Sequence, residues 1–173
     1  MANLASTISK SPWEHSISFR LRGGSRVEAF ISEEVAERLR HTLDEGGEGF
    51  VVFDSEDARI AVNCNHLFLH HIRRYPGRRV KRDSTADLSL KILFSESMQI
   101  EKFAVNSDTE DAEEENDPRA SLLQLLMQNV EIGDSRAYFV DDGGDEVNFD
   151  LEEVALISVP LLHVVPSMKS ADD

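Results

Sequence analysis

The feature of this sequence that most constrains its fold is an internal similarity between its two halves. Residues 17–21 alternate apolar and polar side chains, as a half-buried strand does, and residues 90–94 repeat the alternation 73 positions later. Residues 27–30 and 100–103 correspond at the same spacing, each with an aliphatic residue, a glutamate and a phenylalanine. Two glycines between the first two strands predict a tight hairpin there, because glycine accepts the positive φ that such turns need.

A helix is expected next in each half. Ser32 can cap the first helix, which ends at Gly46, and its apolar stripe recurs 87 positions later in a helix that begins at Asp117 and Pro118. The two stripes are Val35, Ala36, Leu39 and Leu43, and then Leu122, Leu123, Leu126 and Val130. The rise in spacing from 73 to 87 locates a 14-residue insertion before the second helix.

Further strands follow the helix in each half. Residues 49–53 correspond to 136–140, an acidic turn comes next in both halves, and Val62-Asn63 aligns with Val147-Asn148 at a spacing of 85. We therefore predict an α+β protein of internally duplicated β-β-α-β-β units, packed as a pseudo-twofold antiparallel sheet or a partly closed barrel. The alternative is a chance match between generic α+β patterns, since the alignment needs gaps.

The expected organisation has five parts. They are an N-terminal arm (1–15), a first repeat (16–72), a basic linker (73–87), a second repeat (88–165) and a C-terminal tail (166–173). Within the second repeat, residues 106–117 hold seven acidic side chains and almost no apolar ones. Such a segment buries too little apolar surface to offset its ordering entropy, so we expect a disordered acidic insertion.

The linker opens with a dense basic segment, residues 73–82, in which six of ten side chains are basic. Arginines with a tyrosine among them can contact phosphates and stack on a base, which makes nucleic acid one candidate partner. Against this, 33 acidic and 18 basic residues give a formal charge of −15, which repels a polyanion. Two other interpretations are open. The linker can lie against acidic neighbours on the surface of its own chain, or the acidic insertion can fold over the linker and compete with an anionic partner. The candidate partner-binding residues here are Arg73, Arg74, Tyr75, Arg78, Arg79, Lys81 and Arg82.

No arrangement of catalytic or metal-ligating residues is recognised in the sequence. His66, His70 and His71 cluster, but on the strand that the repeat predicts, His66 and His70 lie about 13 Å apart, too far to share a metal ion. The acidic stretch 141–146 lacks the alternating ligands of a calcium loop and is interpreted as a turn. Cys64 is the only cysteine. The sequence therefore predicts no catalytic residues, no metal and no cofactor.

Two apolar features are candidates for contact with a partner. Trp13 precedes the first strand, where it can either pin the N-terminal arm to the domain or serve as an exposed anchor. The apolar run 159–165 continues past the repeat and includes Leu161 and Leu162. Pro160 and Pro166 favour an edge strand there, which could pair with a partner or within the chain.

These observations predict a non-enzymatic protein-interaction or regulatory module whose partner is another protein or a second copy of the chain. The second hypothesis is nucleic-acid binding through 73–82, and the third is a small-molecule enzyme with a site between the repeats. No apolar run is long enough to cross a membrane, and no signal peptide is recognised, so we expect a soluble cytoplasmic protein without membrane contact.

Overall fold

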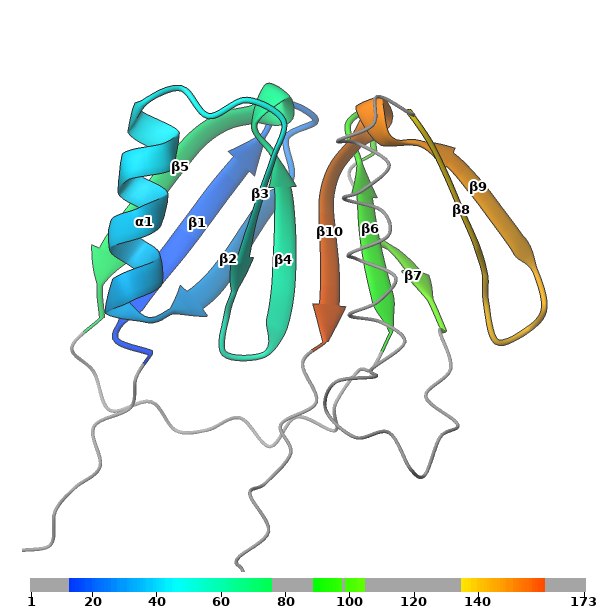
Figure 1. Cartoon of the computed structure of the whole chain (residues 1–173), viewed down its shortest axis with the longest axis horizontal. Coiled ribbons are helices and arrows are strands. Elements are labelled where there is room, and N and C mark those ends of the chain that lie inside the picture. The colour runs from blue at the N-terminus through cyan, green and yellow to red at the C-terminus, as the bar shows by residue number, and fades with distance from the viewer. Residues whose placement is uncertain (1–12, 76–88, 98, 105–134, 161–173) are drawn as a thin grey trace, which may run out of the picture.

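The computed structural model describes residues 13–75, 89–97, 99–104 and 135–160, and Figure 1 labels the elements within these ranges. The strands are β1 (His15–Leu21), β2 (Arg26–Ile31), β3 (Phe50–Asp54), β4 (Ala58–Asn63), β5 (Leu67–Arg74), β6 (Leu90–Phe94), β7 (Glu101–Phe103), β8 (Arg136–Val140), β9 (Glu146–Asp150) and β10 (Val154–Pro160). The helices are α1 (Glu33–Asp44) and the short 3-10 helices η1 (Cys64–His66) and η3 (Leu151–Glu153). We call residues 13–75 the first half and the described residues from 89 to 160 the second half. The expected second helix, the acidic insertion 106–117 and the linker beyond Tyr75 lie outside the described residues.

The helix α1 forms as its sequence predicts. The Ser32 hydroxyl accepts a hydrogen bond from the backbone N–H of Val35 at 3.2 Å, and two glutamates occupy the first turn, where the helix dipole favours negative charge. Ala36 and Leu39 are buried and lie against the first half's core. The helix ends before Gly46, whose φ of 78° is readily adopted only by glycine.

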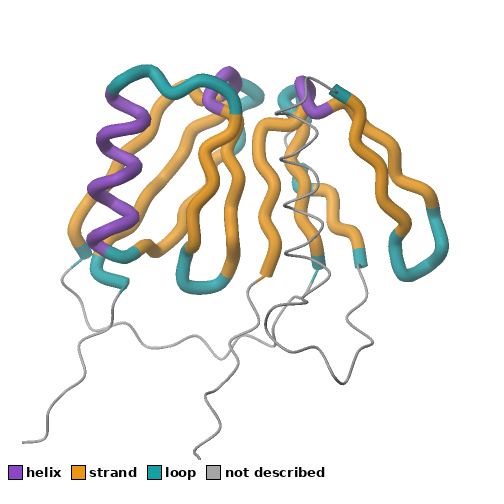
Figure 2. Tube along the Cα trace, viewed as in Figure 1, coloured by secondary structure: helices purple, strands orange, loops and turns teal. Residues whose placement is uncertain are grey.

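The strands form three antiparallel sheets rather than one continuous sheet. Their strand orders are β2-β1-β5, β3-β4-β10-β6-β7 and β8-β9, and Figure 2 shows how strongly strand dominates the described chain. The α+β class is therefore consistent with the structure, and the described strands do not form the single continuous sheet that was one of the two expected packings. The apolar alternation fixes which face of each strand is buried, but it leaves open which edges pair.

The two halves meet where β4 pairs antiparallel with β10, an arrangement that we call the seam. Leu156 lies opposite Val62, and Ile157 lies opposite Ala61. Side chains cross this seam in both directions, because Ala155 and Leu156 belong to the core of the first half while Ala61 belongs to the core of the second. Among the described strands, β4 and β10 pair across the two halves, whereas β5 and β9 do not pair with each other.

A close contact between two hairpin turns also joins the halves. A Cβ on Gly23, in the turn between β1 and β2, would lie only 2.4 Å from the carbonyl oxygen of Ser95. The Ser25 hydroxyl donates to the carbonyl of Ser97 in the same place. Glycine at position 23 therefore permits an approach of two backbones that any side chain would prevent.

Candidate functional site

The most exposed large apolar side chains of the described chain include two neighbours on β5. Phe68 is 74% exposed and Leu69 is 50% exposed. Strand β5 is the edge of its sheet, with β1 on one side and no strand of the described residues on the other. An edge strand that carries exposed apolar side chains offers both unpaired backbone groups and apolar surface to a partner.

The start of β5 is fixed by the short helix that precedes it. The side-chain carbonyl of Asn63 accepts from the backbone N–H of Asn65 at 3.0 Å, which caps η1. The N–H of Cys64 donates to the carbonyl of Gly49 at 2.7 Å, and the N–H of Arg22 donates to the carbonyl of His66 at 2.9 Å. These bonds hold the first residues of β5 against the loop after α1 and the turn after β1.

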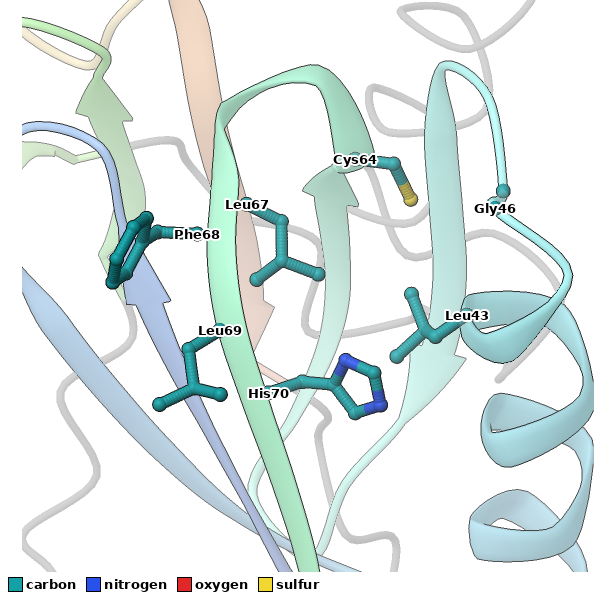
Figure 3. Close-up of a pocket in the computed structure, with 8 residues that line it drawn as sticks. Leu43, Gly46, Cys64, Leu67, Phe68, Leu69 and His70 are labelled. Carbon is teal, nitrogen blue, oxygen red and sulfur yellow. The ribbon is translucent and has the colours of Figure 1, made fainter.

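A β-bulge then turns Phe68 and Leu69 to the same face. Arg20 lies opposite Leu69 and Leu21 lies opposite Leu67, so Phe68 has no residue opposite it in β1. An extra residue in one strand interrupts the regular alternation of side chains. In Figure 3, Phe68 and Leu69 project from β5 away from Leu43, whereas Leu67 and His70 project toward it.

A shallow pocket of about 260 Å³ opens beside these side chains (Figure 3). It lies between β5, η1 and the C-terminal end of α1, and all of its lining comes from the first half. We call this lining the β5 patch: Leu43, Gly46, Gly47, Cys64, Leu67, Phe68, Leu69 and His70. Four of its eight residues are large apolar ones, Leu43, Leu67, Phe68 and Leu69, and polar atoms also face the pocket.

Two titratable side chains line the β5 patch. Burial raises the pKa of the Cys64 thiol, which is therefore a neutral and weakly reactive group at physiological pH. The Nε2 of His70 lies 3.6 Å from Oδ1 of Asp44. Within the described residues no three His, Cys, Asp or Glu side chains are grouped so that they could hold a metal ion.

The structure brings together part of the predicted basic site. Arg73 and Arg74 form the end of β5, and Tyr75 follows it. The guanidinium of Arg74 lies 3.7 Å from the carboxylate of Glu14, and the ring of Tyr75 packs edge-on against that of Phe30 with centroids 5.7 Å apart. Arg73 is exposed. Two of these three described residues thus contact their own chain.

The remaining predicted partner-binding residues divide into one that is described and six that are not. Trp13 is half-buried just before β1. Arg78, Arg79, Lys81, Arg82, Leu161 and Leu162 lie outside the described residues.

The three clustered histidines lie in different surroundings. His66 lies in η1 rather than on the predicted strand, and its Nε2 donates to the carbonyl of Glu152 at 2.6 Å. That bond joins the two halves beside the seam. His70 and His71 lie on β5, where His70 faces the β5 patch and His71 is exposed.

Sequence reasoning did not single out Phe68 and Leu69. The available signal was the run Leu67-Phe68-Leu69, because three consecutive apolar residues cannot all face one side of a regular strand. Such a run indicates either a strand buried on both faces or a bulge at an exposed edge. Only the fold shows that the second holds here.

Comparison with protein-family models, with curated proteins and with solved structures finds no match to this chain. Among the described residues, no helix has the length and apolar character needed to span a membrane.

Proposed function

We propose that the chain is a protein-interaction module that binds its partner through the edge of β5 and the β5 patch. The observation that carries the proposal is the exposure of Phe68 and Leu69 on a strand whose outer edge has no partner among the described residues. An added strand would satisfy the backbone groups of that edge while its side chains enter the pocket.

We further propose that the module consists of two duplicated units, the second half repeating the first. Two β-bulges support this. In the first half the bulge falls at Phe68, between the pairs Leu21–Leu67 and Arg20–Leu69. In the second half it falls at Ala155, between the pairs Phe94–Val154 and Leu93–Leu156. The bulged residues Phe68 and Ala155 are 87 positions apart, and the residues that flank the bulge on β1 and β6 are 73 positions apart. These are the two spacings at which the halves of the sequence match each other.

The pairing pattern and the 3-10 helices add to this support. β1 pairs with β2 and β5, just as β6 pairs with β7 and β10, and the hairpin β3–β4 corresponds to β8–β9. Asn63 caps η1 and Asp150 caps η3, each through a side-chain oxygen that accepts from the N–H two residues later. This correspondence supports a spacing of 87 between β4 and β9, in place of the spacing of 85 that aligns Val62-Asn63 with Val147-Asn148 in the sequence.

The binding proposal is tested with immobilised full-length chain and lysate, with and without nuclease. We expect a saturable protein partner that is retained by the wild type and lost when Phe68→Ser and Leu69→Ser are combined. The matched control combines Tyr138→Ser and Val140→Ser, which remove similarly exposed apolar side chains from β8. Retention that survives the β5 substitutions would overturn the proposal. Retention that disappears with nuclease would favour nucleic-acid binding through 73–82.

A further inference from the structure

We propose that the partner of the β5 edge is the β9 edge of a second copy of this chain, so that copies associate head to tail. This inference rests on the proposed function and on the duplication of the two units. It assigns one occupant to the β5 patch and a second binding surface to the opposite end of the molecule.

The seam inside the chain is the pattern for this contact. There the last strand of the second unit, β10, pairs with the fourth strand of the first unit, β4. Strand β5 takes the place of β10 in its own unit, and β9 takes the place of β4. Within the described residues, β10 has strands on both sides, whereas β5 and β9 each have a strand on only one. The β10–β4 pairing is thus made within the chain, while the corresponding edges of β5 and β9 have no strand beside them in the part of the chain that the structure describes.

Burial differs between corresponding residues in the way that this contact requires. Ala155 and Leu156 are each 1% exposed because they enter the core of the neighbouring unit. Phe68 and Leu69 hold the corresponding places on β5 and are exposed, since no neighbouring strand of the described residues covers them. On the other strand, Ala61 is fully buried at the seam, whereas the corresponding Asn148 is exposed. The residues left exposed are those that a next copy would cover.

The seam also fixes the register of the proposed pairing. Leu156 opposite Val62 becomes Leu69 opposite Phe149, and Ile157 opposite Ala61 becomes His70 opposite Asn148. The same register sets Arg73 opposite Asp145, since Pro160 lies opposite Ala58. An apolar pair, a polar pair and an ion pair of opposite sign therefore follow from one alignment.

The position of the two edges makes the association head to tail. Figure 1 shows β5 and the β8–β9 hairpin at opposite sides of the molecule, so one chain cannot pair its own β5 with its own β9 in this arrangement. A contact between different surfaces of identical copies is heterologous, and it produces a closed ring or an open chain of copies. A twofold dimer would use one surface twice and is a different outcome.

The outer contact is expected to be weaker than the seam. The side-chain amide of Asn63 donates to the carbonyl of Val154 at 3.1 Å across the seam. Its counterpart is Asp150, whose carboxylate cannot donate to the carbonyl of Leu67 in the next copy. Arg20 also stands where the second unit has the buried Leu93, which makes the outer face more polar. Association should therefore depend on protein concentration.

The test mixes two variants of the full-length chain at near-physiological ionic strength, where repulsion between copies of charge −15 is screened. Leu69→Asp blocks the β5 edge and leaves β9 intact, while Asn148→Arg blocks β9 and leaves β5 intact. Sedimentation should show wild-type species larger than a dimer, each variant alone as a monomer, and the mixture as a one-to-one dimer. Val140→Asp, which changes an exposed apolar residue of β8, should assemble as the wild type does.

A strengthening variant supplies an independent measurement should a blocking variant unfold. Asp150→Asn restores the missing donor and keeps the oxygen that caps η3, as Asn63 does both in the seam. We expect it to tighten association about five- to tenfold, the value of one net hydrogen bond. A wild type that stays monomeric at all concentrations, or a mixture that forms no dimer, would overturn the inference. A monomeric chain that still binds another protein through Phe68 and Leu69 would overturn head-to-tail association alone and leave the proposed function standing.

Discussion

Strands β5 and β10 hold the same place in the two halves, yet one is covered and the other is open. Both follow a capped 3-10 helix, both begin with a bulge, and both pair with the first strand of their half. The difference comes from the neighbour, because β10 also pairs with β4 and is buried along almost its whole length. β5 lacks such a neighbour within the described residues and exposes five of its eight side chains. The same local structure is therefore core in one half and surface in the other.

The largest expected difference between the two strands is in the stability of the chain. Leu156→Ala should lower the free energy of unfolding by about 2–4 kcal/mol, because it leaves a cavity at the seam. Leu69→Ala, at the corresponding position of β5, should change it by less than about 0.5 kcal/mol at low protein concentration. Urea unfolding of both variants checks the contrast. Equal losses would mean that β5 is covered as fully as β10.

A second prediction concerns the hairpin turns that touch beside the seam. Gly23→Ala should lower the free energy of unfolding by about 1–3 kcal/mol, because its Cβ would meet the backbone carbonyl of Ser95. Gly143→Ala is the matched control in the turn of the β8–β9 hairpin, where the atom nearest to the added Cβ is a side-chain carboxylate oxygen of Asp141 at 3.2 Å. Thermal unfolding should separate the two variants. A harmless Gly23→Ala would show that the turns do not approach so closely.

A third prediction isolates one hydrogen bond of the seam. Asn63→Asp keeps the oxygen that caps η1 but loses the donor to the carbonyl of Val154, so we expect a loss of about 1–2 kcal/mol in unfolding free energy at neutral pH. Asp150→Asn, its counterpart in the second half, should be nearly neutral for the unfolding of the monomer. Denaturant titration of both variants measures the difference. If Asp150→Asn lowered the free energy of unfolding and Asn63→Asp left it unchanged, the assignment of seam and open edge would be reversed.

A fourth prediction uses Cys64, which lies in the β5 patch of the first half. Because burial raises its pKa, alkylation by iodoacetamide should be slower than that of a free thiol at pH 8. The rate should keep rising at pH values where a free thiol has levelled off. The neutral thiol favours the folded chain, so its small contribution to stability is present below the unfolded thiol pKa and is lost as pH rises through the folded one. Mass spectrometry of folded and urea-unfolded samples measures both profiles, and coincident profiles would contradict the burial of the thiol.

Much of the local structure follows from the sequence alone. The alternation in residues 17–21 and 90–94 predicts β1 and β6, and Ser32 with its apolar stripe predicts α1. These features depend on residues close together in the chain. Phe19, Phe53 and Phe139 are buried, because a phenylalanine in an amphipathic strand favours the apolar face.

The seam and the β5 patch could not be predicted in the same way. Pairing of β4 with β10 joins residues 94 to 102 positions apart, and no local pattern selects it over the pairing of β4 with β5. The bulge at Phe68 also depends on the register with β1. From the sequence alone, the apolar residues of β5 and β10 are both expected in the core. Only the arrangement of strands decides which of them remain exposed.

Hydrogen exchange of β5 and β10 at two protein concentrations is the most direct test of the comparison between them. Head-to-tail association predicts that the amides of β10 are protected at both concentrations, because the seam lies within one chain. The outward amides of β5 and β9 should be protected together in the concentrated sample and exchange rapidly after dilution. Fast exchange of both edges at every concentration, or protection of β5 that does not change on dilution, would contradict the assignment of β9 of a second copy as its partner.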